Sequence, residues 1–232
     1  MEKLSPGQIH LADQRGFTET DTLQRFCSFN YGTYFNEHRK PFGKLSVFND
    51  EVLAGGKTTL LRAEKAGYVV FIPITGELIL QDANRDSRII DVGQVYMDYA
   101  FPGEVLKLVN RYADDKINYL YFFVDSETDF YDGRLFNFDL TDKQNELIGI
   151  GLEQTAIPFR LNIGMFSGRT DALYHLPKNS LFYAFVIAGA FEVQGRLMHQ
   201  RDGLALWQQD EVDMEALSNN AVIVILELPS EA

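Results

Sequence analysis

The fold is indicated most clearly by residues 67–80, GYVVFIPITGELIL. Val, Ile and aromatic residues dominate this run, and Gly76-Glu77 interrupts it near its end. β-branched and aromatic side chains favour strands, and a glycine between two such segments is typical of a tight turn. We therefore predict a β-hairpin here, with Pro73 marking an edge, a bulge or a break into two strands.

The same pattern returns in the second half of the chain. Residues 181–194, LFYAFVIAGAFEVQ, form another apolar run, with Gly189-Ala190 at its predicted turn. After each run come a polar stretch that contains glycine and a final apolar segment, Tyr119–Val124 in one half and Val222–Leu228 in the other. Two similar units at this spacing predict a duplicated barrel or sandwich.

Most of the remaining apolar segments are also short and lie between Gly, Pro, Asn and Asp. They predict strands at Lys44–Asn49, Ile117–Val124 and Ala221–Leu228. The clearest helical spacing is in residues 142–152, which follow Thr141 as a candidate N-cap. The expected fold is all-β, with two barrels in tandem and few short helices. The first barrel would span residues 1–125, a linker residues 126–142, and the second barrel residues 143–232.

Composition excludes several kinds of partner. The 232 residues carry a net charge of −12, so the chain lacks the basic surface that attracts phosphate backbones or anionic membranes. We expect neither direct nucleic-acid binding nor membrane binding. The polar N-terminus does not resemble a signal peptide, and the single cysteine, Cys27, allows no intramolecular disulfide. A cytoplasmic location is the simplest expectation, and the oligomeric state is left open.

Four segments occur in an order that points to a family. They are Ala12-Asp13-Gln14-Arg15-Gly16, then Phe26-Cys27-Ser28-Phe29 followed by Tyr31 and Tyr34, then Leu45-Ser46-Val47-Phe48-Asn49-Asp50-Glu51, and finally Asp202-Gly203-Leu204-Ala205-Leu206-Trp207. They resemble the A-D/N-E-R-G, T-F-S-F-x-x-Y-Y, L-R-V-I-N-D-D and D-G-L-A-I-W motifs of the pirin family. The resemblance runs from about residue 10 to residue 229. It implies a bicupin, in which two jelly-roll barrels lie in tandem.

The resemblance also implies where a metal would be held. In pirins the N-terminal barrel binds one iron-like metal through an H-P-H motif and an H-S-E motif. Counting back from Gly76 places the first motif at Arg62-Ala63-Glu64, and counting back from residues 117–124 places the second at Leu106-Lys107-Leu108. Arg62 would repel a divalent ion and the leucines offer no lone pair, so we expect no metal and no other cofactor.

The histidines do not suggest a replacement site. His10, His38, His175 and His199 are scattered and show no H-x-H spacing. In the second barrel, Tyr174 and Leu176 take the place of a first cupin motif, so His175 between them is expected to face outward. Cys27 is expected to be a buried structural thiol.

The five residues singled out for a first-barrel cavity are Arg62, Glu64, Tyr68, Leu106 and Leu108. Arg62, Glu64, Leu106 and Leu108 are expected to converge, while Tyr68 either lines the same space or fills the core. Arg62 and Glu64 either pair at a solvated rim or recognise a small anionic or aromatic ligand, because a guanidinium can grip a carboxylate or phosphate through two hydrogen bonds.

Three functions compete on this basis. We favour a non-catalytic protein that binds a small molecule or a protein partner. An oxygenase resembling quercetin 2,3-dioxygenase is disfavoured, because its metal ligands are missing from the aligned motifs. A metal-independent enzyme would use Glu64 as a base and Arg62 as an electrostatic stabiliser.

Overall fold

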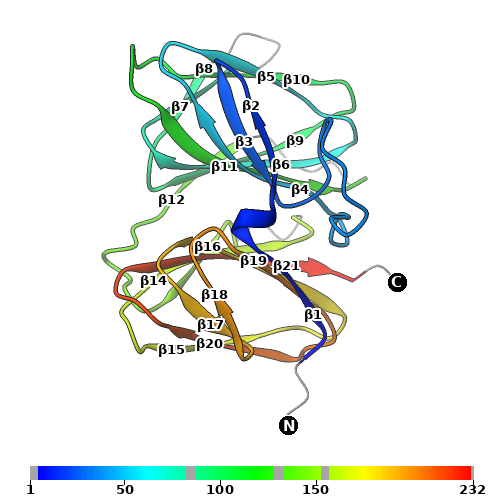
Figure 1. The fold of residues 1–232 in the computed structure, drawn as a ribbon, viewed down its shortest axis with the longest axis vertical. Helices are drawn as coiled ribbons and strands as arrows, with labels where there is room; N and C mark the ends of the chain where they lie inside the picture. The colour runs from blue at the N-terminus through cyan, green and yellow to red at the C-terminus, as the bar shows by residue number, and fades with distance from the viewer. Residues whose placement is uncertain (1–4, 82–86, 128–132, 153–156, 231–232) are drawn as a thin grey trace. The chain divides into compact units, whose positions relative to one another are not determined.

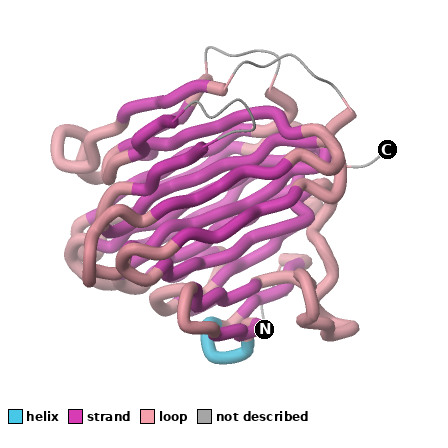
Figure 2. Tube along the Cα trace, turned by 90° about the horizontal axis from the view of Figure 1, so that it is seen from above, coloured by secondary structure: helices cyan, strands magenta, loops and turns pink. Residues whose placement is uncertain are grey.

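Strands account for nearly all the regular structure of the protein (Figure 2). The computed structural model describes residues 5–81, 87–127, 133–152 and 157–230. In these ranges the one helix is the short 3-10 turn η1 (Ala12–Gln14), and no helix is long and apolar enough to cross a membrane. The paired strands run antiparallel. The predicted all-β class is confirmed.

The chain divides into two compact units, each made of two facing antiparallel sheets (Figure 1). We call residues 15–138 the first jelly roll. We call residues 1–14 together with 139–232 the second jelly roll. In each unit the two sheets stay separate and do not close into one continuous barrel. Apolar side chains from both sheets fill the space between them.

In the first jelly roll, seven strands form the larger sheet and four the smaller. In spatial order the larger sheet contains β12 (Arg134–Asn137), β9 (Gln94–Ala100), β6 (Gly67–Thr75), β11 (Ile117–Asp125), β4 (Leu45–Leu53), β3 (Leu23–Cys27) and β2 (Gly16–Glu19). The smaller sheet contains β5 (Thr58–Arg62), β10 (Val105–Val109), β7 (Leu78–Gln81) and β8 (Ser87–Ile90).

The second jelly roll has six strands in its larger sheet and four in its smaller one. The larger sheet contains β1 (Gly7–His10), β19 (Gly203–Leu206), β16 (Ser180–Ala188), β21 (Ala221–Pro229), β14 (Arg160–Phe166) and β13 (Leu147–Ile150). The smaller sheet contains β15 (Asp171–His175), β20 (Glu211–Ala216), β17 (Phe191–Val193) and β18 (Arg196–Met198).

The expected duplication is visible in the strand order. The order β9-β6-β11-β4-β3 of the first jelly roll becomes β19-β16-β21-β14-β13 in the second. The smaller sheets match in the same way, since β5-β10-β7-β8 becomes β15-β20-β17-β18. The two halves of the chain therefore repeat one connectivity, as their similar apolar runs indicated.

The strand pairing divides the chain differently from the sequence-based division at residues 125 and 143. β1 lies at the N-terminus, yet it pairs with β19 and completes the larger sheet of the second jelly roll. β12 falls in the proposed linker, yet it pairs with β9 of the first. Both are four-residue edge strands. Their backbone N–H and C=O groups can pair with any available neighbouring strand, so their sequences do not specify a partner.

The two predicted hairpins are wrong in their pairing, although both turns exist. Gly76 and Gly189 adopt positive φ angles of 70° and 74°, which suit glycine. The strands they join belong to different sheets, because β6 and β16 lie in the larger sheets while β7 and β17 lie in the smaller ones. At Pro73 the β6–β11 register shifts, which is the bulge offered as one alternative.

The helix predicted over residues 142–152 is also wrong. Leu147–Ile150 form β13, which pairs with β14 along its whole length. The polar residues before it close a turn instead of capping a helix, because Asp139 Oδ1 accepts the backbone N–H of Thr141 at 2.8 Å. Asn145 then takes a left-handed conformation with φ of 67°, which ends any helical path before the leucines.

We expect Asp202→Ala to destabilise the second jelly roll by about 1–2 kcal/mol, because it removes a buried carboxylate that accepts hydrogen bonds from two partly buried N–H groups. Asp202 is 3% exposed, and its carboxylate accepts the backbone N–H groups of Ala12 at 2.7 Å and His199 at 2.8 Å. The single tryptophan, Trp207, follows β19, so its fluorescence during urea unfolding reports on this unit. Replacing the exposed Asp91 by Ala is the control, and an equal loss there would contradict the expectation.

Candidate functional site

The register of β5 against β10 decides where the predicted cavity residues point. Arg62 lies opposite Val105, and Leu61 lies opposite Leu106. Directly opposite residues share a face of the sheet, so Leu61 and Leu106 point inward while Arg62 points outward. Exposure agrees, because Arg62 and Glu64 are exposed whereas Ala63 between them is buried.

The four residues expected to converge are therefore split between two faces. Leu106 and Leu108 are fully within the apolar core of the first jelly roll, together with Leu61 and Ala63. Arg62 and Glu64 alternate with these inward-facing residues along the chain, so they lie on the opposite face. The expectation that all four share one spot is wrong, because a one-residue shift along a strand moves a side chain to the opposite face.

Tyr68 is not part of the cavity either. It is fully buried on β6, where it alternates with the core residues Val69 and Phe71. Its ring meets that of its cross-strand neighbour Tyr99 edge-on, with 5.4 Å between centroids. Tyr68 thus packs on the other face of the larger sheet, and its role is to fill space there.

A polar row crosses the inner face of the larger sheet instead. Arg25, Glu51 and Tyr119 lie directly opposite one another on β3, β4 and β11. Arg25 Nε donates to Glu51 Oε1 at 2.5 Å, and the Tyr119 hydroxyl donates to Glu51 Oε2 at 2.7 Å. Glu51 is completely buried, so these two donors supply the compensation that a buried carboxylate requires.

The ionisation of this row follows from burial and from the Glu51 charge. Burial lowers the pKa of Arg25, but the adjacent Glu51 carboxylate outweighs it, so the pKa is raised and the guanidinium stays protonated. Burial and the Glu51 charge raise the pKa of Tyr119 well above its usual range. Tyr119 therefore remains a neutral hydrogen-bond donor to a charged acceptor.

A second row lies next to the first and contains Cys27, Asn49 and Tyr121. Asn49 Nδ2 donates to Glu51 Oε1 at 3.3 Å, which adds a third donor to that carboxylate. Cys27 is 1% exposed, and burial raises its pKa to about 11. The expected burial of Cys27 is confirmed, and its raised pKa disfavours the thiolate form that a nucleophile requires.

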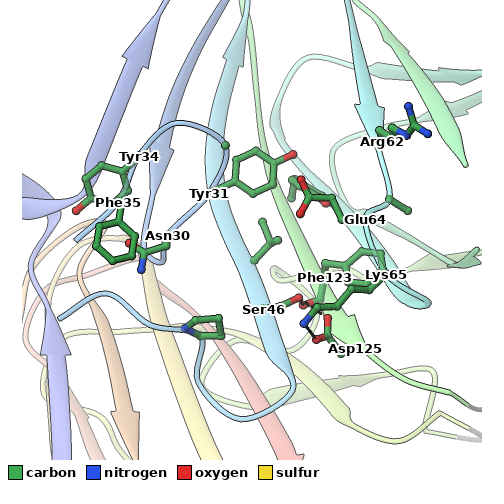
Figure 3. A pocket seen from close by; sticks show the side chains of 15 residues that line it. Asn30, Tyr31, Tyr34, Phe35, Ser46, Arg62, Glu64, Lys65, Phe123 and Asp125 are labelled. Atoms are coloured by element: carbon green, nitrogen blue, oxygen red, sulfur yellow. Dashed lines mark hydrogen bonds and ion pairs between the residues drawn. The ribbon is translucent and has the colours of Figure 1, made fainter. Parts of the chain in front are cut away.

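A pocket of about 310 Å³ opens beside these rows (Figure 3). Its walls come from the segment before β4, from β4 itself, from the end of β5 and from β11. The aromatic and proline side chains that line it are Tyr31, Tyr34, Phe35, Pro41, Tyr121 and Phe123. Its volume lies at the lower end of the range of small-molecule sites.

The polar groups of this pocket lie mainly at its rim. Lys65 Nζ and the Ser46 hydroxyl both contact the Asp125 carboxylate at 2.6 Å. Glu64 points toward the Tyr31 hydroxyl, whereas Arg62 extends away from both (Figure 3). The two residues that the sequence singled out thus border one pocket without pairing with each other.

Tyr31 connects the pocket with the polar row. It lines the pocket, and the guanidinium carbon of Arg25 lies 4.8 Å from the centre of its ring. On another side its ring meets that of Tyr121 edge-on, at 6.2 Å. Burial raises the pKa of Tyr31, so it too is a neutral phenol at physiological pH.

In the second jelly roll the outward orientation of His175 is confirmed. Its side chain is 75% exposed, 3.9 Å from Glu211, while Tyr174 and Leu176 on either side pack toward the core. The Tyr174 hydroxyl donates to Glu227 at 2.9 Å. Nowhere in the described part of the chain do three His, Cys, Asp or Glu side chains gather closely enough to hold a metal ion.

Sequence reasoning missed Arg25, Glu51 and Tyr119 as a group. Glu51 had been read only as the end of a family motif, and Arg25 had no motif at all. A signal was present, because residues 47–53 of one strand place Val47, Asn49, Glu51 and Leu53 on one face. Two polar residues on an otherwise apolar face predict a buried polar cluster, but they do not reveal its partners.

Residues 153–228 match the family model described as the quercetinase C-terminal cupin domain. YhhW from Escherichia coli superposes with a TM-score of 0.86 at 16% identity, over 97% of this chain and 99% of YhhW. The chain therefore has the two-cupin fold of bacterial pirin, and its C-terminal part is similar to the quercetinase C-terminal cupin domain.

Other pirin-like and quercetinase structures agree with this. A complex of bacterial pirin YhhW with nickel(II) gives a TM-score of 0.84 at 16% identity, over 97% of this chain and all of that one. A quercetin 2,3-dioxygenase from Acinetobacter baumannii gives 0.69 at 13% identity, over 99% and 87%. In sequence, a putative quercetin 2,3-dioxygenase of Pseudomonas aeruginosa is 22% identical over 92% of this pirin-like chain and 96% of its own length.

The observed register changes which substitutions should create a metal site. We expect the variant Leu61→His, Ala63→His, Leu106→His, Leu108→Glu to gain divalent-metal binding, because these four side chains share the inner face. Nickel binding by calorimetry, with circular dichroism to confirm folding, is the measurement. The control carries Arg62→His and Glu64→His in place of the two β5 changes. Tighter nickel binding by that control would show that the assigned register is wrong.

Breaking the buried Arg25–Glu51 ion pair should lower the free energy of unfolding by an amount that depends on which charge remains. We expect Arg25→Met to lower the free energy of unfolding by about 3–5 kcal/mol, because Glu51 stays buried without its cation. The double variant Arg25→Met, Glu51→Gln should recover much of that loss. Urea unfolding followed by circular dichroism measures both.

The exposed pair Arg169–Glu215, at 3.1 Å, provides the comparison. Arg169→Met should change stability by less than about 1 kcal/mol, because water screens an exposed pair. If Arg25→Met were equally mild, Glu51 could not be the uncompensated buried charge described above.

Proposed function

We propose that this pirin-like protein is a metal-free binding protein, and that the pocket beside Tyr31 takes a small aromatic molecule. The observation that carries the proposal is the pairing of an aromatic-walled pocket with an inner face of β5 and β10 that lacks metal donors. Aromatic walls favour flat aromatic ligands through stacked and edge-on contacts. A few polar groups at the rim then fix the orientation of such a ligand.

The fit of a metal was tested on the residues that face inward from β5 and β10. Leu61, Ala63, Leu106 and Leu108 present hydrocarbon only, so they do not fit the nickel ion that the YhhW complex contains. The nearest carboxylate of this region, Glu64, points out of the core. No step of any reaction is therefore assigned to a metal in this unit.

A metal-independent enzyme built on Glu64 and Arg62 is less well supported. Arg62 borders the pocket but extends away from Glu64, so the two side chains do not point at one shared atom (Figure 3). Electrostatic stabilisation requires donors that already point at the atom on which charge develops. Binding without turnover is the function that this arrangement favours.

The proposal predicts ligand binding without oxygen consumption. Titration calorimetry with quercetin should show saturable binding to the purified protein, and an oxygen electrode should show no uptake above the buffer rate. Tyr31→Ala should weaken binding about tenfold, because one aromatic wall of the pocket is lost. Phe17→Ala is a matched control, since Phe17 is a half-exposed aromatic residue outside the pocket lining.

Two results would overturn the proposal. One is stoichiometric iron, nickel, zinc or copper in the purified protein together with oxygen uptake on addition of quercetin. The other is binding that is unchanged by Tyr31→Ala, which would locate the ligand elsewhere.

A further inference from the structure

We propose that Arg25 is the anion-binding group of this pocket, and that the ligand is an aromatic carboxylic acid. The inference rests on the proposed aromatic site and names its ligand class. It assigns to Arg25 the anion-binding role that the sequence analysis gave to Arg62. The proposal stands on the orientation of Arg25, on its remaining hydrogen-bond donors and on its position against Tyr31.

Arg25 is only partly engaged by its buried partner. Among the described residues it donates one hydrogen bond, from Nε to Glu51, and its two Nη groups donate none. Those groups carry the pair of parallel N–H bonds that matches a carboxylate. The side chain is 19% exposed, so the unengaged donors are shielded from most water but can still be reached.

The position of Arg25 links these donors to the pocket. Its guanidinium lies against the ring of Tyr31, which is itself part of the pocket wall. Arg25 is not itself among the lining residues, so an acid whose ring occupies the aromatic pocket would have to extend its carboxylate past Tyr31 to reach this guanidinium. Because Arg25 is largely buried, its interaction with an anion is screened less by water and salt than that of a surface cation.

The two cations at the rim are poorer candidates. Lys65 is 66% exposed and already contacts Asp125 at 2.6 Å, so its charge is both solvated and paired. Arg62 is an exposed residue of the pocket rim and points away from Tyr31 (Figure 3). Arg25 is thus the cation near Tyr31 whose free donors lie in a shielded environment.

Glu51 makes the site selective without abolishing its attraction for anions. It holds the Nε edge of the guanidinium in place, and Tyr119 and Asn49 donate to the same carboxylate. These donors offset the Glu51 charge, and the Nη groups of Arg25 make no hydrogen bond to it. A planar carboxylate can pair with both Nη groups, and a ligand without a negative charge gains less there.

The test compares 2-naphthoate with 2-naphthamide, which share a ring system and differ in charge. Calorimetry on the full chain should show naphthoate binding about tenfold more tightly than the amide, as one charge-assisted contact provides. The double variant Arg25→Met, Glu51→Gln removes both buried charges, so it is expected to fold, and it should bind the two probes equally. Arg25→Lys should give an intermediate ratio, because it keeps the charge and loses the fork.

Arg169→Met, at an exposed arginine of the second jelly roll, is the control and should leave the naphthoate-to-naphthamide ratio unchanged. Equal binding of the two probes by the unaltered protein would overturn the Arg25 proposal and leave the aromatic site intact. Failure of both probes to bind would overturn the aromatic site and the Arg25 proposal together. A ratio that survives the double variant, or that is lost in Lys65→Met, would assign the anion to the rim and overturn the role of Arg25.

Discussion

The buried carboxylate of Glu51 is the constraint around which the first jelly roll is organised. A charge with no exposed surface requires partners at fixed positions, and here they come from the strands on either side, Arg25 of β3 and Tyr119 of β11. A slip of either strand by one residue would replace these donors with side chains of the opposite face. The ion pair therefore specifies the register of three strands. The same register sets Tyr121 and Phe123 of β11 in the pocket wall.

The repeated connectivity shows a second constraint, which is the exposed edge of each larger sheet. β9 and β19 occupy equivalent places, and each is covered by a short strand from a segment that the duplication itself does not explain. β12 covers β9, and β1, from the other end of the chain, covers β19. Unpaired edges invite association with other chains, so both jelly rolls benefit from this cover. The carboxylate of Asp202 ties the chain just after β1 to the turn that leads into β19.

Much of the fold could be predicted from sequence, because apolar runs and their glycine turns are local signals. The strands and the duplication follow from them, and at Pro73 they left an edge, a bulge or a break as alternatives. Pairing is not a local property, so the turns at Gly76 and Gly189 could not be distinguished from hairpins. The prediction of the site residues failed for a related reason. Counting from Gly76 placed Arg62 and Glu64 on the inner face, and an error of one residue exchanged the inner and outer faces of β5. Arg25 and Glu51 are 26 positions apart, and only the fold brings them together.

On the proposed function, the polar centre of this jelly roll is a guanidinium and not a metal. A metal offers open coordination positions and accepts several geometries of ligand, whereas a guanidinium offers donors in one plane and only to an acceptor. A fold that keeps the cavity and replaces a metal by a guanidinium would exchange reactivity for selectivity. The inner face of the smaller sheet is then free to become hydrocarbon, as Leu61 and Leu106 are. The polar groups collect on the larger sheet, where Glu51 and Tyr119 fix the arginine before any ligand arrives. That pre-organisation lowers the conformational entropy lost on binding, which is the advantage of a buried, anchored arginine over a flexible one at the rim.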